Sequence, residues 1–266
     1  VCSAGLAYAA PFSVNADTTV SAVAGKSGWK PSERVTGELV IIHGGNELLV
    51  DRDASGAVID GSLGEDEYST SISGINDGFG DVIGVNSTMY VDSTSGGGVQ
   101  FGLQSIAGLY DVVVIYLDTV SGGFTTTQFM SDHSGAHQRA VSGSSVDGQS
   151  VMQFAPGFEA DYAIAIDQDS AALYALSESN HTSVADLSLT PVGQSEAGVW
   201  EFELNLEDVS LSSGDHFRFV ATYLAENAFR SSEFLGVASG TGNDGNIGLN
   251  QVVLAVNDYA VFASSP

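Results

Sequence analysis

Apolar and polar residues alternate most regularly over residues 199–207, VWEFELNLE. One set of alternate positions is apolar and comprises Trp200, Phe202, Leu204 and Leu206. The intervening set is polar and comprises Glu201, Glu203, Asn205 and Glu207. A period of two places successive side chains on opposite faces, so this segment is predicted to be a strand with one face in a core and one in solvent. Trp200 is then expected to be a core residue.

Similar patterns recur along the chain. Further strands are predicted at 81–92, 99–104, 110–118, 161–167, 171–176, 216–223 and 250–262. Within 110–118 the apolar positions are consecutive rather than alternating, as expected for a strand that is covered on both faces. Residues 37–43 and 46–51 are predicted to pair as a hairpin around Gly44 and Gly45.

The spacing of these segments indicates the fold class. Thirty-two glycines provide frequent turn signals, and no apolar spacing of helical period extends beyond about two turns. Many short strands separated by turns favour an all-β protein, a two-sheet β-sandwich of jelly-roll type. We expect residues 1–35 to form an N-terminal extended arm with its lead-in, and residues 36–266 to form a single sandwich domain.

Charge restricts the possible partners. The chain has 33 Asp and Glu against 7 Lys and Arg, a formal net charge of −26. A surface this negative repels phosphate backbones, so nucleic-acid binding is not expected. The acidic side chains either form a solvated surface or are neutralised in part by divalent cations. The single cysteine, Cys2, excludes a disulfide within the chain.

Short motifs resemble a known family. The segment VIDGSLGEDEY at 58–68 resembles the opening of family-nine-like carbohydrate-binding modules and their DOMON-like relatives. The segments STMYVDSTSGGGVQFGLQ at 87–104 and VVVIYLDTVSGG at 112–123 are similar to the hairpin and the strand that follow in that superfamily. The resemblance covers about residues 58–262 and implies a β-sandwich that is secreted or displayed at the cell surface.

The resemblance also implies ligands. Binding modules of this family often hold sugars with exposed aromatic side chains, so a polysaccharide partner is one hypothesis. Its candidate contacts are Tyr68, Tyr90, Phe124 and Phe129, for which core packing is the alternative. Haem-binding relatives hold iron with a Met and a His. Met89 with His133, His137 or His181 would take that role here, and a core position for Met89 is the alternative.

Calcium is the one cofactor for which the residues themselves suggest a site. Asp51, Asp53, Ser55 and Gly56 match the first, third, fifth and sixth positions of a calcium loop. The acid expected at the twelfth position is absent, so an EF-hand is excluded. A β-turn loop could still bind calcium through Asp51, Asp53, Ser55 and Asp60. In the alternative, the same side chains cap backbone amides of an unliganded turn.

Catalytic signatures are absent from the sequence. His133 and His137 have the spacing of zinc ligands on a helix, but Gly135 between them favours a polar loop. There is no G-x-S-x-G elbow and no phosphate-binding glycine loop with a lysine. We therefore expect a protein that is not an enzyme.

The N-terminal segment suggests another function. Residues 1–14 are apolar and include Leu6, Tyr8, Phe12 and Val14, but the segment is too short to span a bilayer. Such an arm can add a strand to a neighbouring copy, or it can fold back on its own domain. We therefore expect an extracellular structural protein that self-assembles into a fibre or surface layer, with glycan binding as the alternative function. Residues 1–9 also resemble the end of a signal peptide.

Overall fold

The computed structural model describes residues 18–22, 35–39, 46–50, 57–64, 67–94, 96–193, 196–237 and 245–264, with only the backbone in the first three ranges and at residue 264. The contacts divide the chain into a unit that ends at residue 43 and a unit that spans 44–265. In the first unit, β1 (Thr18–Ala22) pairs antiparallel with β2 (Val35–Leu39).

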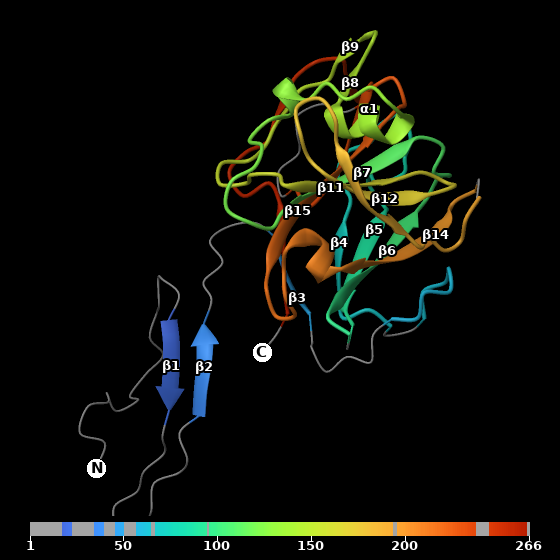
Figure 1. Cartoon of the computed structure of the whole chain (residues 1–266). Helices are drawn as coiled ribbons and strands as arrows, with labels where there is room; N and C mark the ends of the chain where they lie inside the picture. The colour runs from blue at the N-terminus through green and yellow to red at the C-terminus, as the bar shows by residue number, and fades with distance from the viewer. Residues whose placement is uncertain are drawn as a thin grey trace, which may run out of the picture. The chain divides into compact units, whose positions relative to one another are not determined.

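The second unit is built around two sheets (Figure 1). The smaller has four antiparallel strands in the order β14 (Gly198–Asn205), β6 (Gly98–Ser105), β5 (Thr88–Ser93) and β4 (Thr70–Ser73). The all-β sandwich predicted from the sequence is confirmed.

The larger sheet has nine strands. Five neighbours follow the order β13 (Thr182–Leu187), β12 (Ala171–Ala175), β11 (Tyr162–Ile166), β7 (Val112–Asp118) and β15 (Phe217–Leu224). Beyond β15 the sheet divides into two branches. One contains β16 (Arg230–Leu235) and β17 (Asn246–Gly248), and the other contains β19 (Ala260–Ser264) and β3 (Asn46–Val50).

Short elements complete the domain. The helix α1 (Ala136–Ser142) and the 3₁₀ turns η1 (Thr127–Phe129) and η2 (Leu206–Val209) lie in the connections. Two-residue strands form the pairs β8 (Ser144–Ser145) with β9 (Gly148–Gln149), and β10 (Met152–Gln153) with β18 (Val252–Val253). No helix within the described residues has the length and apolar character needed to cross a bilayer.

The main core lies between the two sheets. Phe101 stacks on Phe202 within the small sheet, with ring centroids 5.1 Å apart, and meets Phe219 of the large sheet edge to face at 6.1 Å. Trp200 is fully buried, as predicted. Burial of each large apolar side chain is worth about 1.5–3 kcal/mol, so this interface between the sheets is a major source of stability.

The large sheet is covered on its second face as well. Ile115 and Leu117 of β7 face the main core, whereas Tyr116 points the other way and meets Phe154 edge to face at 5.0 Å. The Tyr116 hydroxyl donates to the carbonyl of Val141 in α1 at 2.6 Å. Figure 1 shows α1 beside β7 and β11 on this outer face. The whole of β7 is buried, so the predicted strand with two covered faces is confirmed.

Several sequence predictions are wrong in detail. The predicted pairing of 37–43 with 46–51 is wrong for the described strands, because β2 pairs with β1 and β3 pairs in parallel with β19. The predicted strand at 81–92 begins only at Thr88. Residues 80–83 instead bend around the buried carboxylate of Glu233, whose two oxygens accept the N–H groups of all four residues at 2.7–3.0 Å.

The predicted polar loop around the histidine pair holds for His133 but is wrong for His137, which lies in a helix. The helix α1 begins at Ala136, directly after Gly135, which is extended at its N-cap. Gly143 ends the helix in the left-handed conformation, with φ of 58°, that favours glycine. A seven-residue helix is too short to give a clear periodic signal, and its stability comes from packing on the sheet.

Candidate functional site

A segment of the chain crosses the outer face of the small sheet, the face turned away from the core. We call residues 57–69 the strap; it is described except for residues 65 and 66. Its anchor is Glu201 of β14. One carboxylate oxygen of Glu201 accepts the N–H groups of Asp60 and Gly61 at 3.0 and 2.7 Å, and the other accepts the Tyr68 hydroxyl at 2.6 Å. Glu201 is therefore fully buried, and the prediction that it faces solvent is wrong.

The strap brings two of the predicted glycan contacts together. The rings of Tyr68 and Tyr90 are 5.8 Å apart and tilted by 49°. Gly102 of β6 lies beneath the strap, where an added Cβ would be 3.1 Å from Cζ of Tyr68 and 3.2 Å from Leu63. The absence of a side chain at residue 102 thus allows Tyr68 to lie close to the sheet.

The hydroxyl of Tyr68 acts as a hydrogen-bond donor to Glu201. Burial, together with the hydrogen bond to Glu201, raises the pKa of Tyr68 well above its ordinary value. The group therefore stays protonated and donates to the carboxylate. This fixes the orientation of the ring, which is half-buried, and leaves part of its surface open to solvent.

Polar side chains surround the tyrosine pair on the same face. Ser71 lies opposite Tyr90 in the strand register, and Thr88 lies opposite Gln104. The Tyr90 hydroxyl donates to the side-chain oxygen of Gln104 at 3.3 Å. We call this set of five residues the tyrosine surface: Tyr68, Ser71, Thr88, Tyr90 and Gln104. All five are partly or fully exposed.

The tyrosine surface is built on segments without basic residues. The strap and the strands β4, β5, β6 and β14 contain no Lys, Arg or His. Hydroxyl and amide groups can exchange hydrogen bonds with a hydroxylated ligand, and a tyrosine ring can cover the apolar C–H face of a sugar. The surface therefore suits an uncharged ligand with both polar and apolar faces.

The other two predicted contacts lie elsewhere. Phe124 exchanges backbone hydrogen bonds with Ala160 at 2.8 and 2.9 Å, and Phe129 is 61% exposed in η1. Their segment is bonded to residues 152–154, which pack over the outer face of the large sheet. The two sheets thus separate Phe124 and Phe129 from the tyrosine surface.

The predicted calcium loop is only partly described. Asp51, Asp53 and Ser55 lie outside the described residues, as do the arm residues Leu6, Tyr8, Phe12 and Val14. Asp60 is described, and its carboxylate accepts the N–H of Ser62 at 2.9 Å and its hydroxyl at 2.6 Å. Asp60 thus caps its own turn, while the calcium loop as a whole stays a prediction. The described residues contain no group of three side chains suited to a metal ion.

The histidines do not converge. His133 contacts the Ser144 hydroxyl at 2.9 Å, whereas His137 contacts Asp167 at 2.9 Å. Met89 belongs to the core between the sheets, while His137 lies in α1 over the outer face of the large sheet. The structure therefore supports neither a zinc pair nor the methionine–histidine pair of a haem site.

A buried Ser, His and Asp cluster was not predicted. Ser142 Oγ lies 2.9 Å from Nε2 of His181, and Asp132 accepts the backbone N–H of His181 at 2.7 Å. Nδ1 of His181 accepts the N–H of Ser177, so the neutral ring carries its proton on Nε2 and donates it to Ser142. Burial, opposed in part by Asp132, lowers the pKa of His181 and favours that neutral form. To act as a general base for Ser142, His181 would have to carry its proton on Nδ1 and accept the serine proton at Nε2.

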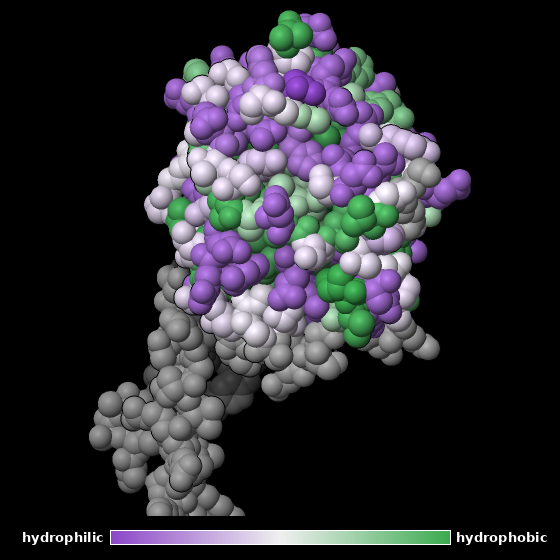
Figure 2. Space-filling view, turned by 45° about the vertical axis from the view of Figure 1, so that its right-hand side comes forward, coloured by the Kyte–Doolittle hydropathy of each residue, from purple (hydrophilic) through white to green (hydrophobic). Residues whose placement is uncertain are grey.

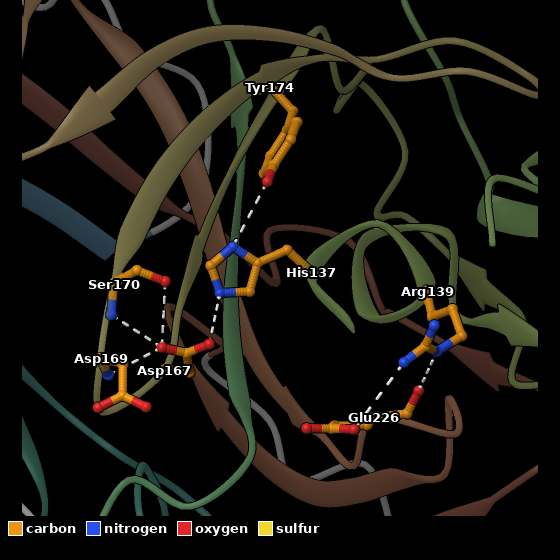
Figure 3. A network of polar contacts seen from close by, with 7 residues as sticks. All are labelled: His137, Arg139, Asp167, Asp169, Ser170, Tyr174 and Glu226. Carbon is orange, nitrogen blue, oxygen red and sulfur yellow. Dashed lines mark hydrogen bonds and ion pairs between the residues drawn. The ribbon is translucent and has the colours of Figure 1, made fainter. Parts of the chain in front are cut away.

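A second polar network joins α1 to the turn between β11 and β12 (Figure 3). His137 lies between Asp167, at 2.9 Å, and the Tyr174 hydroxyl, at 3.4 Å. The second oxygen of Asp167 accepts the N–H groups of Asp169 and Ser170. Burial opposes the charge on Asp167, but these contacts lower its pKa to about 2. The network fixes α1 and the turn relative to each other.

Exposed apolar residues are scattered. The most exposed include Val146, Tyr110 and Val256, which come from separate connections. On the face shown in Figure 2, hydrophobic side chains form small patches between hydrophilic ones. Single exposed apolar residues are normal on soluble domains and do not define a site.

Comparisons with known proteins do not place the chain in a family. No protein-family model matches the chain, and no curated protein matches it. A solved structure from Bacteroides uniformis, described as a candidate carbohydrate-binding protein, aligns with 83% of this chain and 100% of its own. The identity is 6% and the TM-score 0.38, so this likeness carries no argument about function.

Proposed function

We propose that this protein is a secreted or cell-surface β-sandwich, without catalytic activity, that binds neutral glycans on the tyrosine surface. The observation that carries the proposal is the pair of partly exposed rings, Tyr68 and Tyr90, on the polar outer face of the small sheet. The bond from Tyr68 to Glu201 orients the Tyr68 ring before any ligand arrives, which reduces the entropy lost on binding.

The polar side chains around the two rings favour a neutral ligand. Ser71, Thr88 and Gln104 offer hydroxyl and amide groups, and the strands beneath them carry no cation. An acidic polysaccharide would face a chain with a formal charge of −26, and the strap and the strands beneath it offer no basic side chain to compensate.

The test is a binding assay with a panel of soluble neutral polysaccharides, namely xylan, mannan, β-1,3-glucan and hydroxyethyl cellulose. The purified protein should bind at least one of them, and Tyr90→Ala should weaken that binding at least tenfold. Phe129→Ala is the matched control, because Phe129 is an exposed ring on the far side of both sheets. Loss of binding in Phe129→Ala alone, or no binding to any member of the panel, would reject the proposal.

A further inference from the structure

A cavity of about 330 Å³ lies where β7 ends and β15 begins. Its lining includes Asp118, Ser121, Glu159, His216 and Arg218. Phe217 and Phe219 both point into the main core, so Arg218 between them points to the outer face of the large sheet. The cavity and the tyrosine surface therefore lie on opposite outer faces of the sandwich.

Arg218 is fixed at this cavity by three contacts. Its Nη1 donates to the carboxylate of Asp118 and to the carbonyl of Gly157, both at 2.9 Å. Its guanidinium carbon lies 5.5 Å from the centre of the Tyr259 ring. The side chain is 34% exposed, and its Nη2 makes no hydrogen bond to any described residue. A guanidinium in a fixed orientation thus retains a free donor for a ligand.

The charges of the cavity restrict the ligand. Arg218 contributes one positive charge to the lining, His216 contributes an imidazole, and Asp118 and Glu159 contribute carboxyl groups. An anion would meet the two carboxyl groups, and a metal ion would meet the guanidinium. A neutral polyhydroxylated molecule can satisfy both, since its hydroxyls donate to carboxylates and accept from the guanidinium.

The size restricts the ligand further. A volume of about 330 Å³ lies at the lower end of the range for small-molecule sites. It accommodates about one or two sugar rings rather than an extended chain. The floor is rigid, because the ends of β7 and β15 pair through Asp118 and Arg218 and the neighbouring Phe217 is buried.

We propose that this cavity is a second and separate binding site, specific for a single neutral sugar unit. Arg218 donates through Nη2 to a ring hydroxyl, while Glu159 accepts from another. The inference rests on the cavity alone and does not depend on the tyrosine surface.

The test uses calorimetric titration of the full chain with glucose, galactose, mannose and N-acetylglucosamine. At least one should bind with a stoichiometry of one. Arg218→Gln should weaken that binding at least tenfold, and Glu159→Gln, on a half-exposed side chain, should weaken it to a lesser degree. Arg139→Gln is the control, since Arg139 is a partly exposed arginine that bonds to Glu226 in another part of the domain.

Three results would overturn the inference. The first is that none of the four sugars binds. The second is tighter binding of glucuronate, glycine betaine or calcium than of any neutral sugar. The third is equal loss of sugar binding in Tyr90→Ala and Arg218→Gln, which would show that there is only one site. If Arg218→Gln fails to fold, the test rests on Glu159→Gln, and unchanged sugar binding in that variant would overturn the inference. Loss of polysaccharide binding in Tyr90→Ala concerns only the proposed function and leaves the cavity unaffected.

Discussion

Replacement of Asp167 by Asn should remove part of the domain's stability at neutral pH and leave its stability near pH 2 unchanged. In the folded protein, contacts with His137, Asp169 and Ser170 outweigh burial and lower the pKa of Asp167 from 3.8 to about 2. The unfolded chain keeps the ordinary value and binds its proton at a higher pH. The carboxylate therefore stabilises the fold above about pH 4, and this contribution is lost as the pH falls from about 4 to about 2.

The pKa shift of Asp167 determines how much its carboxylate contributes to the free energy of unfolding. Each tenfold change in proton affinity corresponds to about 1.4 kcal/mol, so a lowering from 3.8 to about 2 is worth at most about 2.5 kcal/mol. The side chain of Asp167 is 27% exposed, and solvent screening reduces this value to about 1–2 kcal/mol. An Asn side chain at this position retains one oxygen that can accept the N–H groups of Asp169 and Ser170. The substitution therefore removes mainly the contact between the carboxylate and His137.

The assay is urea unfolding at pH 7, 5, 4, 3 and 2.5. Asp167→Asn should be less stable than the parent by about 1–2 kcal/mol at pH 5–7, with the difference shrinking toward zero at the lowest pH. Asp169→Asn is the control, because it removes the same formal charge from an exposed neighbouring side chain. A deficit for Asp167→Asn that is the same at pH 3 and pH 7 would refute the reasoning, since it would not depend on the carboxylate charge.

Three further predictions concern the core, the calcium loop and the arm. Trp200→Ala should cost about 3–5 kcal/mol in urea unfolding, because the side chain is fully buried, while the exposed Glu203→Ala should be nearly neutral; equal effects would contradict this packing. Millimolar calcium should raise the Tm by mass action, and Asp51→Ala with Asp53→Ala should abolish the rise; melting that is insensitive to chelator would reject the calcium site. Deletion of residues 1–14 should leave a folded domain that sediments as a monomer, whereas the intact chain assembles; an intact chain that is itself monomeric would reject self-assembly.

The candidate sites were only partly predictable. Tyr68 and Tyr90 were named from the sequence, but their contact depends on the path of the strap over Gly102, which lies opposite Tyr90 in the neighbouring strand. The cavity had no sequence signal at all. Its two paired charges, Asp118 and Arg218, are 100 positions apart and meet only because β7 and β15 are neighbours in the large sheet.

The sequence by itself determined the class of fold and many of the strands. Alternation over 199–207 places Trp200 in the core, and the apolar run over 112–116 requires cover on both faces. Both signals are local, because a strand's period is fixed by the backbone geometry of neighbouring residues. Only the tertiary structure decided that Glu201 is buried and that β3 pairs with β19. Those outcomes depend on which distant segment covers a face or an edge, and that choice is set by contacts across the whole domain rather than by any local pattern.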